Sequence, residues 1–451
     1  MKRGILFIAA LVFAGLAAQS AAAQQAWTLQ QCIEYAIENN ISVQQMELSS
    51  QNSEIRLNTA RNSRLPSLNA NIGGSASFGR SLGRENTYVD RTQISGNLGV
   101  STSVPVFNGF NIKHNIAGRE LDFKASLHDL ERAREDVAVT VTSLYMQVLF
   151  NKELLKVAEN QVELSRQQLT RSELLFKNDR SPESDVYEAK ALVARDELSL
   201  TQSRNNLSLS ILDLAQALNL DEYKAFDVMM PRLEEIDMFA MSSLENPREL
   251  YEYAVANRPR ILAEQMRLES SEKSLKMAQS ARWPSINLGA SYGNNAYQSF
   301  TSGAVNKAFI EQMKTNGSES VSLSMNIPIF NKLSTRNNIM TAQVNIKMQE
   351  LTLLNAQLAL NKEIEQAYHS ATAAYDKYLS AEKSVEAARI AFKYAEEKSV
   401  AERSTIFDFN DAKTRLERSE SEAVQAKFDF VFRSKILDFY ADKPLEFELY
   451  Y

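Results

Sequence analysis

The chain has 451 residues with 50 Lys and Arg against 56 Asp and Glu, a net charge of −6, and it is long enough for two domains or one elongated one. This mild acidity argues against a nucleic-acid partner, because such a partner selects a basic surface. A single cysteine, Cys32, excludes a disulfide within the chain.

Residues 1–23 have the features of a secretory signal peptide. A basic start, MKR, precedes an apolar run, and an A-x-A cleavage site ends at Ala23. We therefore expect an exported protein that begins at Gln24, whose charge changes from −6 to −8 because Lys2 and Arg3 leave. Beyond the signal peptide no run of about 18 apolar residues occurs, so we expect no transmembrane helix.

The distribution of glycine separates helical from extended segments. After residue 23, every glycine lies in 73–118 or 289–317. Glycine costs roughly 1 kcal/mol in a helix interior relative to alanine, so the glycine-free stretches 119–288 and 318–451 predict long helices. Apolar residues alternate with Ser, Asn and Gly in four segments, which predicts strands with one apolar and one small polar face, at 68–78, 94–106, 286–292 and 320–329.

In chain order the sequence predicts the same elements twice. RLPSLNA at 64–70 returns as RWPSINL at 282–288, and after the first hairpin Asp185 falls on Asp408. The first repeat, 24–220, has a helix, a hairpin at 68–106, a long helix at 109–177 and a helix at 183–219. A linker at 221–246 leads to the second repeat, 247–440, with a helix, a hairpin at 286–329, a long helix at 332–400 and a helix at 405–439, before a tail at 441–451. The second hairpin is longer, with extra residues in a loop at 298–318, and Pro259 should split its helix near Asn257.

The predicted fold class is α+β, mainly α, with a tandem duplication. Each long helix has about 69 residues and would span roughly 100 Å, which suits a tube better than a globular domain. Four strands cannot close a barrel, and lipid does not tolerate open edges. Two copies would give eight strands with a filled interior, and three would give twelve strands with a lumen. The alternative is a pair of surface hairpins on a soluble core.

Several motifs, in this order and in duplicate, resemble those of the TolC-like outer-membrane efflux proteins. They are the strand entries LPSLN and WPSIN, the strand exits VPVFNG and IPIFN, and the helix start STIFDFNDA. The resemblance covers nearly the whole mature chain. It implies a homotrimer, with a twelve-stranded transmembrane β-barrel in the outer membrane and a long α-helical coiled-coil barrel in the periplasm. Such ducts take drugs, other small molecules or secreted proteins from a periplasmic adaptor (a membrane fusion protein) and an inner-membrane pump.

The sequence departs from the family in two places. Family members often have glycine at the periplasmic turns, where this chain has Asp179-Arg180 and Glu402-Arg403. Many relatives also carry an N-terminal lipid cysteine, which this sequence lacks.

Two aspartates at the start of the last helix are candidates for the pore entrance. Asp408 and Asp411 lie three residues apart and therefore on one helix face, and the resemblance implies that aspartates here ring the periplasmic entrance. Three copies would place six carboxylates around the pore axis, a ring that selects cations and could bind a blocking divalent ion. The alternative for Asp408 is a helix cap, because Thr405-x-x-Asp408 has the pattern of a capping box.

Asp185 corresponds to Asp408 in the repeat, and the resemblance implies that its position takes part in links that hold the entrance closed. The alternative is a favourable charge at a helix start. Four residues at the turns are candidates for the periplasmic tip and for contacts with the adaptor, namely Arg180, Ser181, Arg403 and Ser404. The alternative is that they are solvated turn residues.

The sequence gives little support for an enzyme. His114, His128 and His369 are far apart, and no glycine-rich phosphate loop or metal-ligand spacing occurs. We therefore expect no catalytic residue, no cofactor and no certain metal site.

Two functions other than a duct stay open. A trimeric surface adhesin also builds a twelve-stranded barrel from four strands per chain, but its strands gather at one end of the sequence, whereas here helices separate two hairpins. A structural scaffold of coiled coils, without transport, would partition into the soluble fraction.

Overall fold

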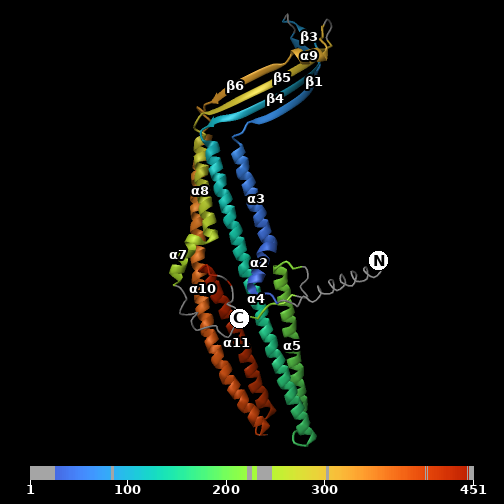
Figure 1. The fold of residues 1–451 in the computed structure, drawn as a ribbon, viewed down its shortest axis with the longest axis vertical. Helices are drawn as coiled ribbons and strands as arrows, with labels where there is room; N and C mark the ends of the chain where they lie inside the picture. The colour runs from blue at the N-terminus through green and yellow to red at the C-terminus, as the bar shows by residue number, and fades with distance from the viewer. Residues whose placement is uncertain are drawn as a thin grey trace, which may run out of the picture. The chain divides into compact units, whose positions relative to one another are not determined.

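The computed structural model describes residues 26–82, 86–220, 226–230, 246–300, 304–401, 403, 405–443 and 445. The predicted signal peptide and most of the predicted linker at 221–246 lie outside these residues. The chain, whose element order is labelled in Figure 1, divides into two compact units that we describe separately. We call residues 1–47, 129–261 and 356–451 the helical unit, and residues 48–128 and 262–355 the sheet unit.

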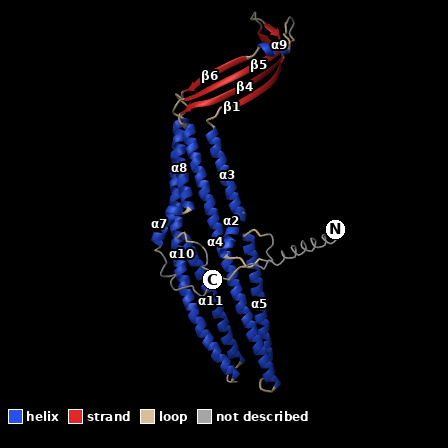
Figure 2. Cartoon of the chain, viewed as in Figure 1, coloured by secondary structure: helices blue, strands red, loops and turns tan. Residues whose placement is uncertain are grey.

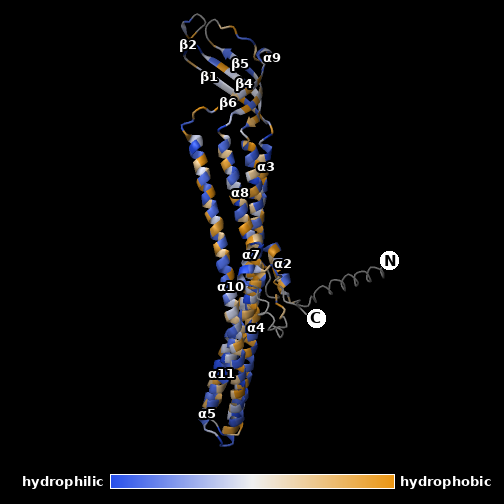
Figure 3. Cartoon of the chain, turned by 90° about the vertical axis from the view of Figure 1, so that its left-hand side faces the viewer, coloured by the Kyte–Doolittle hydropathy of each residue, from blue (hydrophilic) through white to orange (hydrophobic). Residues whose placement is uncertain are grey.

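Two long helices, α4 (Asn111–Lys177) and α10 (Ser334–Val400), have 67 residues each and contribute residues to both units. Each is followed by a helix of 35 residues, α5 (Glu183–Ala217) and α11 (Ile406–Tyr440). The equal lengths reflect the tandem duplication. Polar and apolar residues are mixed along the long helices (Figure 3), and no helix in the described part of the chain is long and apolar enough to cross a membrane.

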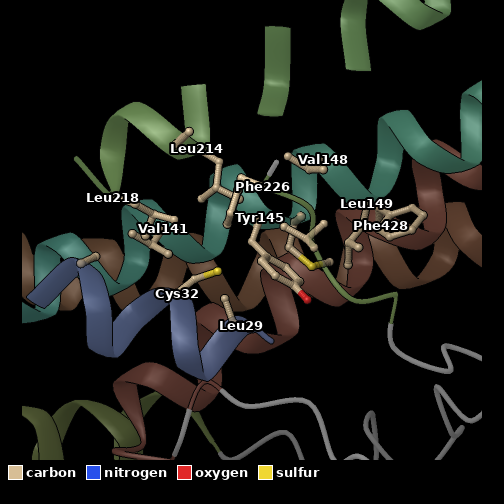
Figure 4. Close-up of a cluster of buried hydrophobic side chains, with 14 of the residues drawn as sticks. Leu29, Cys32, Val141, Tyr145, Val148, Leu149, Leu214, Leu218, Phe226 and Phe428 are labelled. Carbon is tan, nitrogen blue, oxygen red and sulfur yellow. The ribbon is translucent and has the colours of Figure 1, made fainter. Parts of the chain in front are cut away.

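The core of the helical unit is built where α2 (Leu29–Asn39), α4, α5 and α11 pack together (Figure 4). Its labelled side chains are Leu29, Cys32, Val141, Tyr145, Val148, Leu149, Leu214, Leu218, Phe226 and Phe428. The thiol of Cys32 is fully buried, and this burial raises its pKa to about 12. The cysteine therefore serves as a small apolar core residue.

Tyr145 ties two further segments to this core. Its side chain is 1% exposed, and its hydroxyl oxygen lies 2.6 Å from the carbonyl oxygen of Met229 and 3.2 Å from that of Trp27. Trp27 and Val228 form a short parallel bridge, in which the amide of Met229 donates to the carbonyl of Trp27 at 2.9 Å. Because burial raises the pKa of the Tyr145 hydroxyl, it remains a neutral donor.

The predicted break at Pro259 is present. Helix α7 (Pro247–Asn257) ends before Arg258, whose backbone is extended, and α8 (Pro259–Ser280) begins at the proline. Arg258 is 7% exposed, and its Nη1 donates to the Glu135 carboxylate at 2.9 Å. Its guanidinium also lies over the ring of Phe439, 4.1 Å from the centroid. The helix break thus places a buried, paired arginine inside the helical unit.

The sheet unit contains all strands of the described residues (Figure 2). Its main sheet is antiparallel with the order β1-β4-β5-β6. The strands are β1 (Ser67–Ser77), β4 (Gln93–Asn108), β5 (Ser285–Ser299) and β6 (Ser318–Asn326). Helix α3 (Ile41–Asn62) precedes β1, and α8 precedes β5. Strands β1 and β6 are the two edges, so the sheet of a single chain is open.

The register places the predicted apolar residues on one face. Ile72 lies opposite Leu98, and Val100 lies opposite Tyr292. Residues directly opposite one another in an antiparallel pair share a face. The apolar positions of neighbouring strands therefore form one continuous surface.

On the opposite face, small polar residues interlock. The side chain of Asn97 lies 2.5 Å from the place where a Cβ of Gly73 would be, and that of Asn71 lies 2.6 Å from the corresponding place at Gly99. Only glycine leaves room for the opposing asparagine, which explains why Gly and Asn alternate in these strands.

Five local features differ from the prediction. Strand β5 runs to Ser299, beyond the predicted end at 292, because its last residues still pair with β4. Strand β6 ends at Asn326 instead of 329, because Pro328 has no backbone N–H to donate to a ladder. The early helix is broken at Asn40, an extended residue between α2 and α3. The first hairpin carries a second, two-stranded sheet of β2 (Arg80–Leu82) and β3 (Tyr88–Asp90). In the second hairpin, the predicted loop at 298–318 contains a short helix, α9 (Phe309–Thr315).

Candidate functional site

The predicted periplasmic tip consists of the turns that join α4 to α5 and α10 to α11, both within the helical unit. In the first turn, the amide of Arg180 donates to the carbonyl of Leu175 at 2.9 Å and the amide of Asp179 donates to that of Phe176 at 3.0 Å. This is a Schellman motif with Asp179 in the left-handed region, at φ 58°. The aspartate thus adopts the conformation that glycine favours.

The second turn repeats the outer bond of this motif. The amide of Arg403 donates to the carbonyl of Lys398 at 2.9 Å. Between the ends of the long helices, the guanidinium of Arg171 donates to the carbonyl of Ser399. This bond links α4 to α10 directly above the two turns.

Asp408 forms the predicted capping box at the start of α11. Its Oδ2 accepts from the amide of Thr405 at 3.0 Å and from the Thr405 hydroxyl at 2.8 Å, and its own amide donates to Thr405 Oγ1 at 3.2 Å. The bonds from Thr405 lower the pKa of the Asp408 carboxyl. The side chain is exposed, so the cap leaves a negative charge facing solvent.

Asp411, one turn further along α11, is also exposed and forms an ion pair with Arg415 at 2.8 Å. Asp185 is half-buried in the first turn of α5, where its amide donates to the carbonyl of Pro182 at 3.2 Å. Among the described residues, no hydrogen bond or ion pair joins Asp185 to either of the other two aspartates. A single chain therefore presents the three carboxylates separately.

The predicted tip residues lie at the turns themselves. Arg180 and Arg403 are exposed, and Ser181 is half-buried with its Oγ buried. Ser404 lies outside the described residues. Within the described chain, no group of three or more His, Cys, Asp or Glu side chains could hold a metal ion.

Sequence reasoning missed a buried ion pair near these turns. Lys413 of α11 is fully buried and bonds to the carboxylate of Asp196 of α5, which is 3% exposed. Arg195 also lies near Asp196, at 3.7 Å, but its side chain is 58% exposed. Burial, followed by the charge of Asp196, raises the pKa of the neighbouring Glu417. The buried charges of Lys413 and Asp196 connect the two helical hairpins.

Exposed ion pairs repeat in the two hairpins. Arg166 pairs with Glu197 at 2.7 Å, and the corresponding residues of the second repeat, Arg389 and Glu420, pair at 3.3 Å. The helix-to-helix alignment is thus the same in both hairpins. A search for oppositely charged residues at matching repeat positions could have found these pairs, whereas Asp196 and Lys413 are not repeat equivalents.

The comparisons with known proteins match this architecture. Residues 32–220 and 250–431 match the family described as outer membrane efflux protein. The chain is 21% identical over 357 residues to the outer membrane efflux protein BepC of Brucella suis, covering 79% of this chain and 74% of BepC. It is 24% identical over 352 residues to the pyoverdine export outer membrane protein OpmQ of Pseudomonas putida, covering 73% of this chain and 66% of OpmQ.

Solved structures have the same fold. The outer membrane protein VceC from Vibrio cholerae superposes with a TM-score of 0.75 at 16% identity, over 93% of this chain and 97% of VceC. The family match covers most of the chain and includes both repeats, so an efflux duct in the outer membrane is favoured over the adhesin and the scaffold that the sequence left open. The family and the fold are those of channel proteins. The chain belongs to the outer membrane efflux protein family.

Proposed function

We propose that three copies of this chain form the exit duct of a tripartite efflux system, through which small molecules leave passively and without catalysis. The open sheet is the observation that carries this proposal. The outer edges of β1 and β6 are unpaired within the described chain, because β1 pairs only with β4 and β6 only with β5, and open edges are costly in lipid. Because β1 and β6 run in opposite directions, the β6 edge of one copy can pair with the β1 edge of the next in the antiparallel sense of the rest of the sheet.

The two faces of the sheet support a closed barrel around water. On the apolar face, Leu68, Ile72, Val321 and Leu323 are 75%, 84%, 79% and 71% exposed. Such exposure of large apolar side chains is expected of a lipid-facing surface. The Ser, Asn and Gly of the other face suit a lumen, and twelve strands from three copies give a barrel wide enough to have one.

Helix α10 offers a second surface for other copies. Large apolar side chains are exposed along one stripe of its sheet-unit part, at a spacing of three to four residues, namely Met340, Val344, Met348 and Leu351. This spacing is that of a coiled-coil seam. In a trimer, helices of neighbouring copies would cover the stripe.

We place the entrance of the duct at Asp408, Asp411 and Asp185, and the contacts with a periplasmic adaptor and its inner-membrane pump at Arg180, Ser181, Arg403 and Ser404. The exposed charges of Asp408 and Asp411 support a cation-selective ring in the trimer. The exposed arginines at both turns offer cationic side chains to an adaptor.

Single-channel conductance in planar bilayers tests this proposal, and the capping box permits a clean separation of charge from structure. Asp408→Asn keeps an oxygen acceptor for Thr405 and removes the charge, whereas Thr405→Ala removes the two bonds of the Thr405 hydroxyl and keeps the charge. If Asp408 lines the entrance, Asp408→Asn and Asp411→Asn reduce cation selectivity and weaken divalent block, and Thr405→Ala does neither. Parent-like selectivity and block in both Asn variants would refute the gate assignment. Failure of the parent to insert or conduct would refute the duct.

A further inference from the structure

The short helix α9 is fixed to the end of β5 by side-chain amides. Gln312 is 5% exposed, and its Nε2 donates to the carbonyl of Tyr297 at 2.8 Å while its Oε1 accepts from the Tyr297 amide at 3.0 Å. Nearby, Asn316 donates to the carbonyl of Asn295 at 2.7 Å. Strand β6 begins to pair with β5 only at Ser318. Along the last residues of β5, the side-chain amides of Gln312 and Asn316 therefore make the backbone hydrogen bonds that a neighbouring strand would make.

The register shows on which face of the sheet α9 lies. The side chain of Asn294 is buried and donates to the carbonyl of Met313 in α9. Asn294 lies opposite Leu98, which itself lies opposite Ile72, so Asn294 projects from the apolar face. Ala296, on the same face, is 1% exposed. Helix α9 therefore packs on the apolar face, which is the lipid side under the proposed function.

The outer surface of this segment is apolar and is flanked by lysines. Phe309 and Ile310 are 60% and 66% exposed, and Val305 just before the helix is 95% exposed. Lys307 lies before these residues and Lys314 after them. Lys307 pairs with Glu311 at 3.6 Å, and with Glu319 at the start of β6 the segment 304–319 has two positive and two negative charges. Exposed aromatic and aliphatic residues beside lysines are typical of helices that lie in a membrane interface.

The height of α9 along the strands fits that interface. β5 and β6 run to and from the helices at Ser285 and Asn326, and α9 lies at their opposite end, next to Ser299 and Ser318. A paired length of about ten residues, tilted by about 45°, spans the apolar band of an outer-membrane barrel. The helix thus lies at the outer margin of that band.

We propose that α9 is an interfacial anchor that inserts Phe309, Ile310 and Val305 into the outer leaflet and sets Lys307 and Lys314 against its anionic phosphate groups. The inference rests on the proposed function, because that function assigns the apolar face to lipid. The partner is the lipid surface, since α9 lies on the face of the sheet that exposes Val321 and Leu323, and its own Phe309 and Ile310 are exposed as well. Burial against the loops of another copy is the alternative that the experiment tests.

Site-directed fluorescence in lipid vesicles can locate the helix. Cys32 is buried and its raised pKa keeps the thiol unreactive, so single cysteines can be introduced and labelled with an environment-sensitive dye. Phe309→Cys reports on α9. Tyr297→Cys is the matched control, because it lies at the same height on the opposite face. Leu323→Cys, on the apolar face of β6, reports whether the sheet itself is in the bilayer.

The vesicles contain anionic lipid and nitroxide lipids whose spin label lies near the headgroup or deep in the acyl chains. We expect the Phe309 label to be quenched at least about twofold more by the shallow nitroxide than by the deep one, and the Tyr297 label to be quenched only by aqueous iodide. The Leu323 label should be quenched by the deep nitroxide.

Three outcomes would overturn the proposal, and they are distinguishable. In the first, iodide quenches the Phe309 label as freely as the Tyr297 label while nitroxide lipid quenches the Leu323 label, and α9 then lies in water. A Phe309 label shielded from both iodide and lipid, with Leu323 again responding, places it against another copy. A Leu323 label that no nitroxide lipid quenches refutes the transmembrane sheet, and the proposed function fails together with the anchor.

Discussion

Removal of Lys413 is the most informative perturbation of the helical unit. The pair of Lys413 and Asp196 is almost completely withdrawn from solvent, at 0% and 3% exposure. Lys413→Met keeps a chain of similar length but leaves the Asp196 carboxylate buried, and the cation that then remains in contact with it among the described residues is the largely exposed Arg195, at 3.7 Å. An uncompensated buried charge costs about 3–5 kcal/mol, so we expect a loss of unfolding free energy of that size. Asp196→Leu should cost a similar amount, because it strands the buried ammonium.

The double variant decides between this account and a simple packing effect. Replacement of both charges by apolar side chains of similar volume is often neutral or stabilising by about 1–4 kcal/mol. Lys413→Met/Asp196→Leu should therefore be far more stable than either single variant. The matched control is the exposed pair Arg166 and Glu197 between α4 and α5, where Arg166→Met, Glu197→Leu and their combination should each change stability by about 1 kcal/mol or less.

The assay is guanidinium unfolding in detergent, followed by the helical circular dichroism at one fixed protein concentration, since assembly of copies would shift the midpoint. A Lys413→Met variant within about 1 kcal/mol of the parent would show that water reaches the pair, because only a screened pair contributes so little. A double variant as unstable as the two single losses combined would show that packing, not charge, explains the single losses.

Three further predictions concern single positions. Tyr145→Phe should cost about 1–3 kcal/mol in the same assay, because it removes the hydrogen bonds that the buried Tyr145 hydroxyl donates to the carbonyls of Met229 and Trp27. Tyr368→Phe at the half-buried repeat equivalent should stay within about 0.5 kcal/mol. Asp179→Gly should stabilise the chain by up to about 1 kcal/mol, because Asp179 occupies the left-handed region, and Asp179→Val should destabilise it by a similar amount. The pKa of Asp408 is lowered in the fold, so its charged cap is fully present above the ordinary pKa of a carboxyl and is lost as the pH falls through the lowered value. In the parent, amide hydrogen exchange of the first turn of α11, corrected for intrinsic rates, should therefore show less protection at acid pH. The Asp408→Asn variant should show no such change, and an identical acid response in both proteins would contradict this assignment.

The sequence was informative wherever a local rule determined the structure. Pro259 predicted the break between α7 and α8, and the spacing of Thr405 and Asp408 predicted the capping box. Alternation in the strands predicted an apolar and a polar face, because neighbouring residues of a strand project in opposite directions. Each of these features depends on residues a few positions apart.

The sequence was uninformative where the structure depends on contacts between distant segments. No local pattern indicates that Lys413 faces Asp196 of another helix, or that Gln312 folds back onto the backbone of Tyr297. Helix α9 was missed because its seven residues are too short for a helical period to be recognised among loop residues. Asp179 was also unexpected at a left-handed position, since glycine is the usual residue there.

The buried pair of Lys413 and Asp196 occurs in one arrangement and is not repeated by the duplication, so it can determine how the two hairpins align. The repeat equivalent of Lys413 is Lys190, which is exposed beside Glu173 at 3.9 Å, and the equivalent of Asp196 is Ser419, whose hydroxyl lies 3.3 Å from that of Ser384. Two identical hairpins could pack in more than one register, because their apolar seams are alike. A buried lysine is tolerated only where it meets a carboxylate, so every shifted register leaves a charge unpaired. The pair thus selects one alignment of α5 against α11, and with it the relative heights of Asp185 and Asp408 at the two helix starts.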